Sequence, residues 1–161
     1  MNLYLMRHAE AERPGGVIKT DAERPITAYG RFQAETIAEE LKRRGISPLV
    51  VTSPLKRTLQ TAEILCASLG AAPFRQEEKL AATGHAPDLL DLLHAYSEAE
   101  HLLLIGHQPD IGMLVEQILG FELGFSTAAI AAFESRHPSG WKFLWTCRPE
   151  DLMKRKRDPE P

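Results

Sequence analysis

Two apolar segments, far apart in the chain, each end in a histidine. Residues 3–6 read Leu-Tyr-Leu-Met and lead into Arg7 and His8, whereas residues 102–105 read Leu-Leu-Leu-Ile and lead through Gly106 into His107. Short apolar runs of this kind are typical of buried strands. Because ligands bind beyond the carboxyl ends of the strands in open α/β sheets, we expect both histidines to belong to one site.

The composition limits the partners that such a site can have. A chain of 161 residues with 43% hydrophobic and 25% charged residues is typical of one soluble globular domain. Its net charge of −3 gives no reason to expect nucleic acid or an anionic membrane as a partner. Cys66 and Cys147 form no Cys-x-x-Cys pair and suit a reducing compartment. Since no apolar leader precedes the first strand, we expect a cytoplasmic protein without a membrane-spanning segment.

Helical and strand patterns alternate along the chain. We expect helices after Thr27, after Pro54, over 88–96 and over 111–119, and strands over 3–6, 49–52, 102–105, 128–133 and 141–147, with a possible short strand at 74–75. This alternation predicts an α/β fold with a largely parallel sheet. The short link over 135–140 predicts an antiparallel hairpin at one edge of the sheet, with Trp141, Phe143, Trp145 and Cys147 alternating against less buried positions.

Two segments, one after the first strand and one at the C-terminus, are expected to differ from this pattern. Residues 10–21 are polar and carry Pro-Gly-Gly, which predicts a loop over the site. From Arg148 the sequence becomes polar and charged, so we expect a single domain over residues 1–147 and a frayed polar tail over residues 148–161.

Two arginines are expected beside the paired histidines. Arg7 precedes His8, and Arg57 lies in the first turns of the helix that follows the strand at 49–52, so it should emerge at the same edge. Guanidinium groups match phosphate oxygens, and helix N-termini add N–H donors. In such an oxyanion pocket one neutral imidazole can attack phosphorus and the second can donate to an equatorial oxygen. A metal site fits less well, because a third ligand is lacking and arginines repel a cation.

Several segments resemble a known family. Arg7-His8-Ala9-Glu10 and Ile105-Gly106-His107 resemble the two histidine motifs of the histidine phosphatase (phosphoglycerate mutase-like) superfamily. Segments 24–30, 53–62, 106–109 and 125–131 are similar in order and spacing to the short phosphohistidine phosphatases, which act on histidine-containing phosphotransfer domains. The resemblance extends from residue 1 to about residue 147. Because segments 105–107 and 106–109 overlap, the segments form five motifs, and five motifs in order form a strong signal.

The resemblance implies a fold, a set of roles and a substrate. The fold would be a three-layer sandwich with a mixed, mostly parallel sheet flanked by helices. His8 would be the nucleophile, which forms a phosphohistidine intermediate, and Arg7 and Arg57 would bind the phosphoryl group beside His107. Arg24 would be a further phosphate ligand. The substrate would be a phosphohistidine-containing protein, and no metal or cofactor is expected, because the guanidiniums supply the positive charge.

The proton donor that an alkoxide leaving group needs is not evident. Relatives that act on phosphate monoesters carry a glutamate in the segment corresponding to residues 80–85, or an aspartate directly after the second histidine, where this chain has Gln108. General acid catalysis contributes roughly 10²–10⁴-fold, and a leaving imidazole needs it less. This difference favours phosphohistidine as the substrate. If His85 or Asp110 supplies the acid, a small-molecule phosphomonoesterase is the alternative, and a non-catalytic phospho-ligand-binding module is another.

Overall fold

The computed structural model describes residues 1–82, 85, 87–121, 123–136 and 140–157, and within them one sheet has the strand order β3-β2-β4-β1-β5-β6. The strands are β1 (Asn2–Arg7), β2 (Leu49–Thr52), β3 (Arg75–Gln76), β4 (His101–Gly106), β5 (Ile130–Arg136) and β6 (Gly140–Cys147). The first four are parallel to one another, whereas β5 is antiparallel to β1 and β6 is antiparallel to β5. The expected mixed, mostly parallel sheet is therefore confirmed, with the antiparallel pair at one edge.

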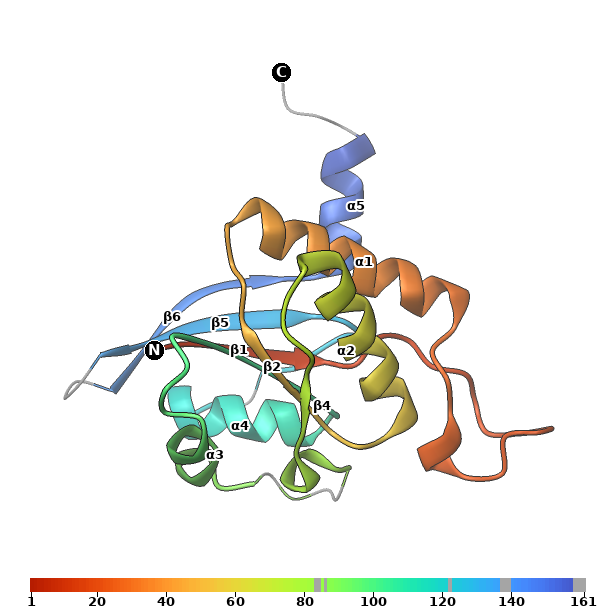
Figure 1. Ribbon diagram of the computed structural model, residues 1–161, viewed down its shortest axis with the longest axis horizontal. Helices are drawn as coiled ribbons and strands as arrows, with labels where there is room; N and C mark the ends of the chain where they lie inside the picture. Colours follow the sequence, from red (N-terminus) through yellow and green to blue (C-terminus); the bar gives the residue numbers. More distant parts are fainter. Residues whose placement is uncertain (83–84, 86, 122, 137–139, 158–161) are drawn as a thin grey trace.

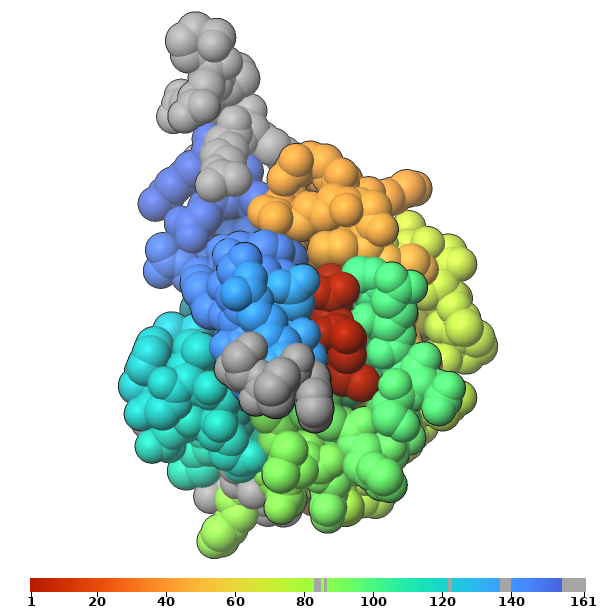
Figure 2. Space-filling view, turned by 90° about the vertical axis from the view of Figure 1, so that its left-hand side faces the viewer, coloured from red at the N-terminus to blue at the C-terminus, as the bar shows by residue number. Residues whose placement is uncertain are grey.

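Helices cover both faces of this sheet and make it the middle of three layers (Figure 1). They are α1 (Ala28–Arg43), α2 (Lys56–Leu69), α3 (Leu89–Ala95), α4 (Asp110–Leu119) and α5 (Pro149–Arg157), with 3-10 turns η1 (Asp21–Glu23) and η2 (Glu78–Leu80). Side chains of α1, α2 and α5 form one hydrophobic core with one face of the sheet, and side chains of α3 and α4 form a second core on the other face. Figure 2 looks at the end where β1 begins and shows it enclosed between β4 and the β5–β6 pair.

Local sequence signals explain where the helices begin and end. The Thr27 side chain accepts a hydrogen bond from the Gly30 amide (2.9 Å) and caps α1. Gly70 and Gly120 end α2 and α4 with φ of 62° and 77°, a left-handed conformation that glycine adopts without strain. The helices expected after Thr27 and Pro54 and over 88–96 and 111–119 are confirmed, with boundaries differing by one or two residues.

The last two strands differ from the simple alternation that the sequence predicts. The register between β5 and β6 shifts at Ala132 and Phe133, because an extra residue bulges from β6 between Phe143 and Trp145. A one-residue bulge moves the following side chains to the opposite face of the sheet. As a result Trp145 packs against the core of α1 and α2, whereas Trp141 packs against that of α3 and α4. The turn at residues 137–139 lies outside the described part of the chain.

The C-terminal segment is not the frayed tail that its polarity predicts. Pro149–Arg157 forms α5, and Leu152 is 8% exposed in the core that α1 and α2 share. Pro149 is buried as well, so two residues of α5 anchor an otherwise charged segment, while residues 158–161 lie outside the described part of the chain. The expectation of a single domain stays a prediction. No helix within the described residues is long and apolar enough to cross a membrane.

Replacing Gly30 by alanine is expected to destabilise the protein and to shift the segment that follows His8. A Cβ atom at Gly30 would lie 2.1 Å from the Glu10 backbone oxygen, which also accepts a hydrogen bond from the Thr27 amide (2.9 Å). Backbone must therefore move, and overpacking of this kind costs about 1–3 kcal/mol. Urea unfolding of Gly30→Ala measures the loss. Gly124→Ala is the matched control, because no heavy atom of the described residues, apart from its two chain neighbours, lies within 4 Å of a Cβ there. Equal stability of the two variants would contradict the prediction.

Candidate active site

The two predicted histidines meet at the carboxyl ends of adjacent strands. Arg7 pairs with Gly106 in the β1–β4 ladder, and the His8 amide donates to the Gly106 carbonyl (3.0 Å). The imidazole rings lie with their centroids 5.2 Å apart. Both side chains are buried, with His8 at 7% and His107 at 3% exposure. The strand register therefore produces the pair that the sequence predicts.

Arg57 bridges the two histidines from the first turn of α2. Its Nε donates to His8 Nε2 (3.3 Å), and its Nη2 donates to His107 Nδ1 (3.1 Å). The residue is 3% exposed. The Thr61 hydroxyl, one turn further along α2, donates to the Arg57 carbonyl (2.7 Å) and accepts from the Ala9 amide (3.1 Å). The helix is thereby tied directly to the backbone beside His8.

These contacts fix the tautomer of each histidine. Arginine has no acceptor atom, so His8 Nε2 and His107 Nδ1, to which Arg57 donates, must be the unprotonated nitrogens. The proton of His8 then lies on Nδ1, which donates to the Ala9 carbonyl (2.7 Å). The proton of His107 lies on Nε2, which donates to the Ser53 hydroxyl (2.8 Å). His8 therefore presents a lone pair on Nε2 toward the arginines.

Arg7, the last residue of β1, lies near the other two arginines of the site. Its Nη1 donates to the Phe125 carbonyl (2.8 Å), in the loop that leads to β5. Its Nε is buried and has no hydrogen-bond partner among the described residues. Burial and the nearby guanidiniums of Arg57 and Arg24 lower the pKa of Arg7. A buried donor of this kind is suited to a phosphate oxygen.

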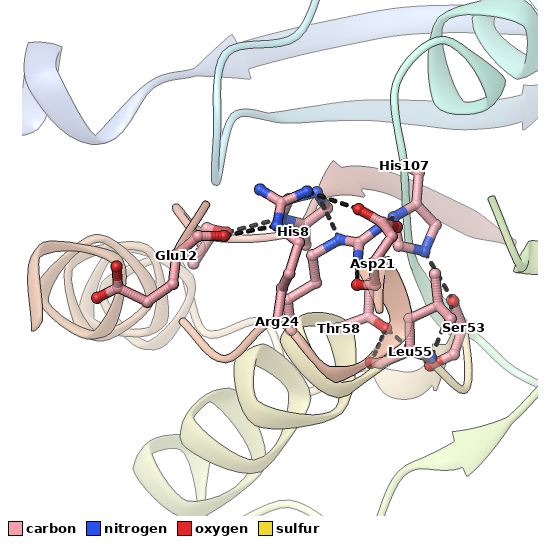
Figure 3. Close-up of polar contacts among 10 residues, drawn as sticks. His8, Glu12, Asp21, Arg24, Ser53, Leu55, Thr58 and His107 are labelled. Carbon is pink, nitrogen blue, oxygen red and sulfur yellow. Dashed lines mark hydrogen bonds and ion pairs between the residues drawn. The ribbon is translucent and has the colours of Figure 1, made fainter. Parts of the chain in front are cut away.

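Arg24 and Asp21 complete the polar cluster from the loop between β1 and α1 (Figure 3). Arg24 donates through Nε to the Glu12 carbonyl and through Nη1 to Asp21 Oδ1 (2.8 Å). Asp21 also contacts Arg57, through Oδ2 to Nη2 (2.9 Å) and through its backbone carbonyl to Nη1 (2.8 Å). The structure thus brings Arg24 to the predicted site, and it adds a carboxylate that the sequence analysis did not assign to it.

Two residues of the site were missed by the sequence analysis. Ser53 follows β2 at the carboxyl edge of the sheet, a position that could have drawn attention to its hydroxyl. Asp21 lies three residues before Arg24, and its spacing from that arginine was the one available signal. Of the two candidate acids, Asp110 is buried in the first turn of α4, and His85 is exposed.

Burial among arginines keeps both histidines neutral. Burial, together with the charges of Arg57, Arg7 and Arg24, lowers the pKa of His8 to about 4, although the hydrogen bond to Ala9 opposes this effect. Burial, with the nearby His8 and Arg57, lowers the pKa of His107 to about 3. At neutral pH the His8 lone pair is therefore not lost to a proton.

The free energy of unfolding is expected to fall as the pH decreases below about 6.5. The unfolded chain binds histidine protons near pH 6.5, whereas the folded protein binds them near pH 4 at His8 and near pH 3 at His107. Between these values the unfolded state holds more protons, so each histidine contributes a slope of up to about 1.4 kcal/mol per pH unit. Above about pH 6.5 neither state is protonated, and this contribution is constant.

Urea unfolding between about pH 7 and about pH 5 measures this slope, since most carboxylates titrate lower. The double variant His8→Gln, His107→Gln should show a shallower dependence. His94→Gln, which changes an exposed histidine of α3, should keep the dependence of the unaltered protein. An unchanged slope in the double variant would assign the acid sensitivity to other groups.

The arrangement defines a class of protein. Two neutral histidines lie among three guanidiniums at the carboxyl edge of a mostly parallel sheet, which suits the binding and transfer of a phosphoryl group. Among the described residues, no group of three or more histidine, cysteine, aspartate or glutamate side chains is arranged to hold a metal ion.

Comparisons with known proteins define the family. Residues 3–85 match the family model of the histidine phosphatase superfamily (branch 1). An uncharacterized protein of Picosynechococcus sp. is 35% identical over 143 residues, which cover 84% of this chain and 86% of that protein. The chain therefore belongs to the histidine phosphatase superfamily, and it is a phosphatase of the hydrolase class.

Two further relatives specify the branch. A phosphohistidine phosphatase SixA homolog of Haemophilus influenzae is 25% identical and covers 99% of this chain and 97% of its own. The structure of the protein histidine phosphatase SixA complexed with tungstate has a TM-score of 0.82 at 26% identity, and it covers 94% of this chain and 99% of its own. The phosphoglycerate mutase-like fold and the resemblance to the short branch of the family are thereby confirmed.

Proposed function

We propose that this enzyme removes the phosphoryl group from a phosphohistidine side chain of a protein, through a phosphorylated His8. The observation that carries the proposal is the state of His8: a buried, neutral imidazole whose Nδ1–H is held by the Ala9 carbonyl and whose Nε2 lone pair faces arginines. An imidazole fixed in this tautomer is a competent nucleophile toward phosphorus.

The proposed reaction has two steps. His8 Nε2 attacks phosphorus, the bond from phosphorus to the substrate imidazole breaks, and its electron pair returns to the leaving nitrogen. The other ring nitrogen of the substrate carries a proton throughout this step, so the imidazole leaves as a neutral group. The phosphorylated His8 ring then carries a positive charge, which its Nδ1–H shares with the Ala9 carbonyl. Water attacks this phosphorus, inorganic phosphate leaves, and neutral His8 is regenerated. Arg7, Arg24 and Arg57 would stabilise the negative charge on the equatorial oxygens.

The state of Asp21 also supports a leaving group that needs little acid catalysis. This carboxylate lies against the arginines, and the hydrogen bond from Arg24 with the charge of Arg57 holds the pKa of Asp21 below its usual range. An ionised carboxylate cannot protonate a departing alkoxide. Phosphohistidine avoids this requirement, because a neutral imidazole is a better leaving group than an alkoxide. The likeness to two SixA proteins is independent support for this substrate class.

The test is steady-state hydrolysis of a phosphohistidine protein against p-nitrophenyl phosphate and a sugar phosphate, in the presence of a chelator. The proposal expects the highest kcat/KM for phosphohistidine. If the sugar phosphate has the highest kcat/KM, and if Asp110→Asn or His85→Ala then slows its hydrolysis, the enzyme is a phosphomonoesterase with an acid at that position. If no substrate is hydrolysed, the chain is a phospho-ligand-binding module.

A further inference from the structure

Asp21 lies in the position where a phosphoryl group would contact the arginines. Its two carboxylate oxygens contact different guanidiniums: Oδ1 accepts from Arg24 Nη1 (2.8 Å), and Oδ2 accepts from Arg57 Nη2 (2.9 Å). Two oxygens held by two arginines is the pattern that a phosphate group makes in such sites. The carboxylate thus satisfies donors that the proposed reaction assigns to the substrate.

The contacts of Arg57 show how completely these donors are engaged. Its Nε donates to His8, its Nη2 donates to both His107 and Asp21, and its Nη1 donates to the Asp21 carbonyl. Four of the five N–H bonds of the guanidinium therefore have partners within the protein. A phosphoryl group can receive a bidentate contact from Arg57 when the Asp21 contacts are released.

The Asp21 contacts are of a kind that can be released. The Asp21 side chain is 57% exposed, whereas that of Arg57 is 4% exposed. The interaction of a largely exposed carboxylate with a guanidinium is weakened by solvent screening and by the entropy lost in holding the exposed side chain. Asp21 also lies in the three-residue turn η1 within the long connection between β1 and α1, and none of the residues of η1 is buried. Its removal from the arginines therefore disturbs neither hydrophobic core.

We infer that Asp21 is an internal competitor for the phosphoryl site, which a substrate must displace before Arg24 and Arg57 can bind it. This inference rests on the proposed function and concerns the selectivity of the same site. A phosphoryl dianion brings two negative charges to the arginines, whereas the Asp21 carboxylate brings one. The dianion is therefore attracted more strongly and can displace Asp21. A ligand with one carboxylate brings the same single charge as Asp21, so it has no electrostatic advantage over Asp21 and does not enter the site. Asp21 thereby selects phosphoryl groups against carboxylates.

The test measures equilibrium binding of inorganic phosphate by calorimetry at a pH where the dianion predominates. Asp21→Ala and Asp21→Asn should bind phosphate about 5- to 10-fold more tightly than the unaltered protein, because phosphate no longer has to displace the ion pairs of Asp21 with Arg24 and Arg57. Glu23→Gln is the matched control, because Glu23 lies in the same turn but accepts a hydrogen bond from Thr20. This variant should bind phosphate as the unaltered protein does.

Added acetate provides a second measurement. Acetate should compete with phosphate in Asp21→Ala, where it can take the place of the missing carboxylate, and it should not compete in the unaltered protein. Unchanged or weaker phosphate binding in both Asp21 variants would overturn the inference and would make Asp21 a residue that positions the arginines. Absence of phosphate binding in every protein would instead overturn the oxyanion pocket and the proposed function.

Discussion

The variant His8→Ala is expected to lose turnover by at least about 10⁴-fold while it retains binding of inorganic phosphate. The reason is the division of roles in the site. In the proposed mechanism, His8 supplies the lone pair that would form the bond to phosphorus, whereas the arginines would supply the contacts that hold the phosphoryl oxygens. Removing the imidazole deletes the first role and leaves Arg7 and Arg24 in place.

The measurement is single-turnover hydrolysis of a phosphohistidine protein, together with trapping of the phosphorylated enzyme by an alkaline quench, in which the bond between phosphorus and a histidine nitrogen is stable. The unaltered protein should yield an acid-labile phosphoryl group on His8, and His8→Ala should yield none. His94→Gln serves as the control, because it changes an exposed histidine of α3. Circular dichroism shows whether the variant is folded. Substantial turnover in folded His8→Ala would exclude the covalent route.

The variant Arg57→Lys is expected to lose about 10²-fold or more in kcat/KM, even though the positive charge is kept. Arg57 fixes the tautomers of both histidines through Nε and Nη2, and a lysine ammonium cannot reproduce this fork. Without the Nε–H donor, the Ala9 carbonyl is the one described contact that still favours the His8 proton on Nδ1. The loss should therefore appear in kcat as well as in KM.

A matched control lies next to Arg57 in the sequence. Lys56 is exposed on the first turn of α2 and makes none of the contacts described for the site. Lys56→Ala should leave kcat/KM within about twofold, the range expected for surface substitutions. Equal losses for Arg57→Lys and Lys56→Ala would show that charge alone, rather than the geometry of the guanidinium, matters at this helix.

The sequence predicts those parts of the site that regular structure positions. His8 and His107 end two apolar strands, and Arg57 begins a helix directly after a third, so strand pairing alone brings them to one edge. Asp21 could not be placed this way. Its approach to Arg57, 36 residues later in the chain, depends on the path of an irregular loop, which no periodicity in the sequence describes.

The distinction between regular structure and contacts that no local pattern describes also explains what the sequence mispredicts in the fold. The bulge between Phe143 and Trp145 arises from pairing with β5. It places the side chains before and after it on opposite faces of the sheet, although the sequence of β6 alone predicts one face for all of them. In α5, the buried residues Pro149 and Leu152 outweigh a run of charged neighbours, because contacts with the core can hold a short helix that is otherwise polar. Both errors come from contacts between distant segments.

The position of β1, between β4 on one side and β5 on the other, separates the site into parts of different local stability. The amide of His8 donates to the Gly106 carbonyl at the carboxyl end of β4, and His8 is buried, so exchange of this amide with solvent deuterium should be much slower than exchange in the exposed turn. The turn that carries Asp21 has few such protections and should open independently. Substitutions in that turn can therefore change which anions the enzyme accepts without a cost to the folding of the residues that perform the chemistry.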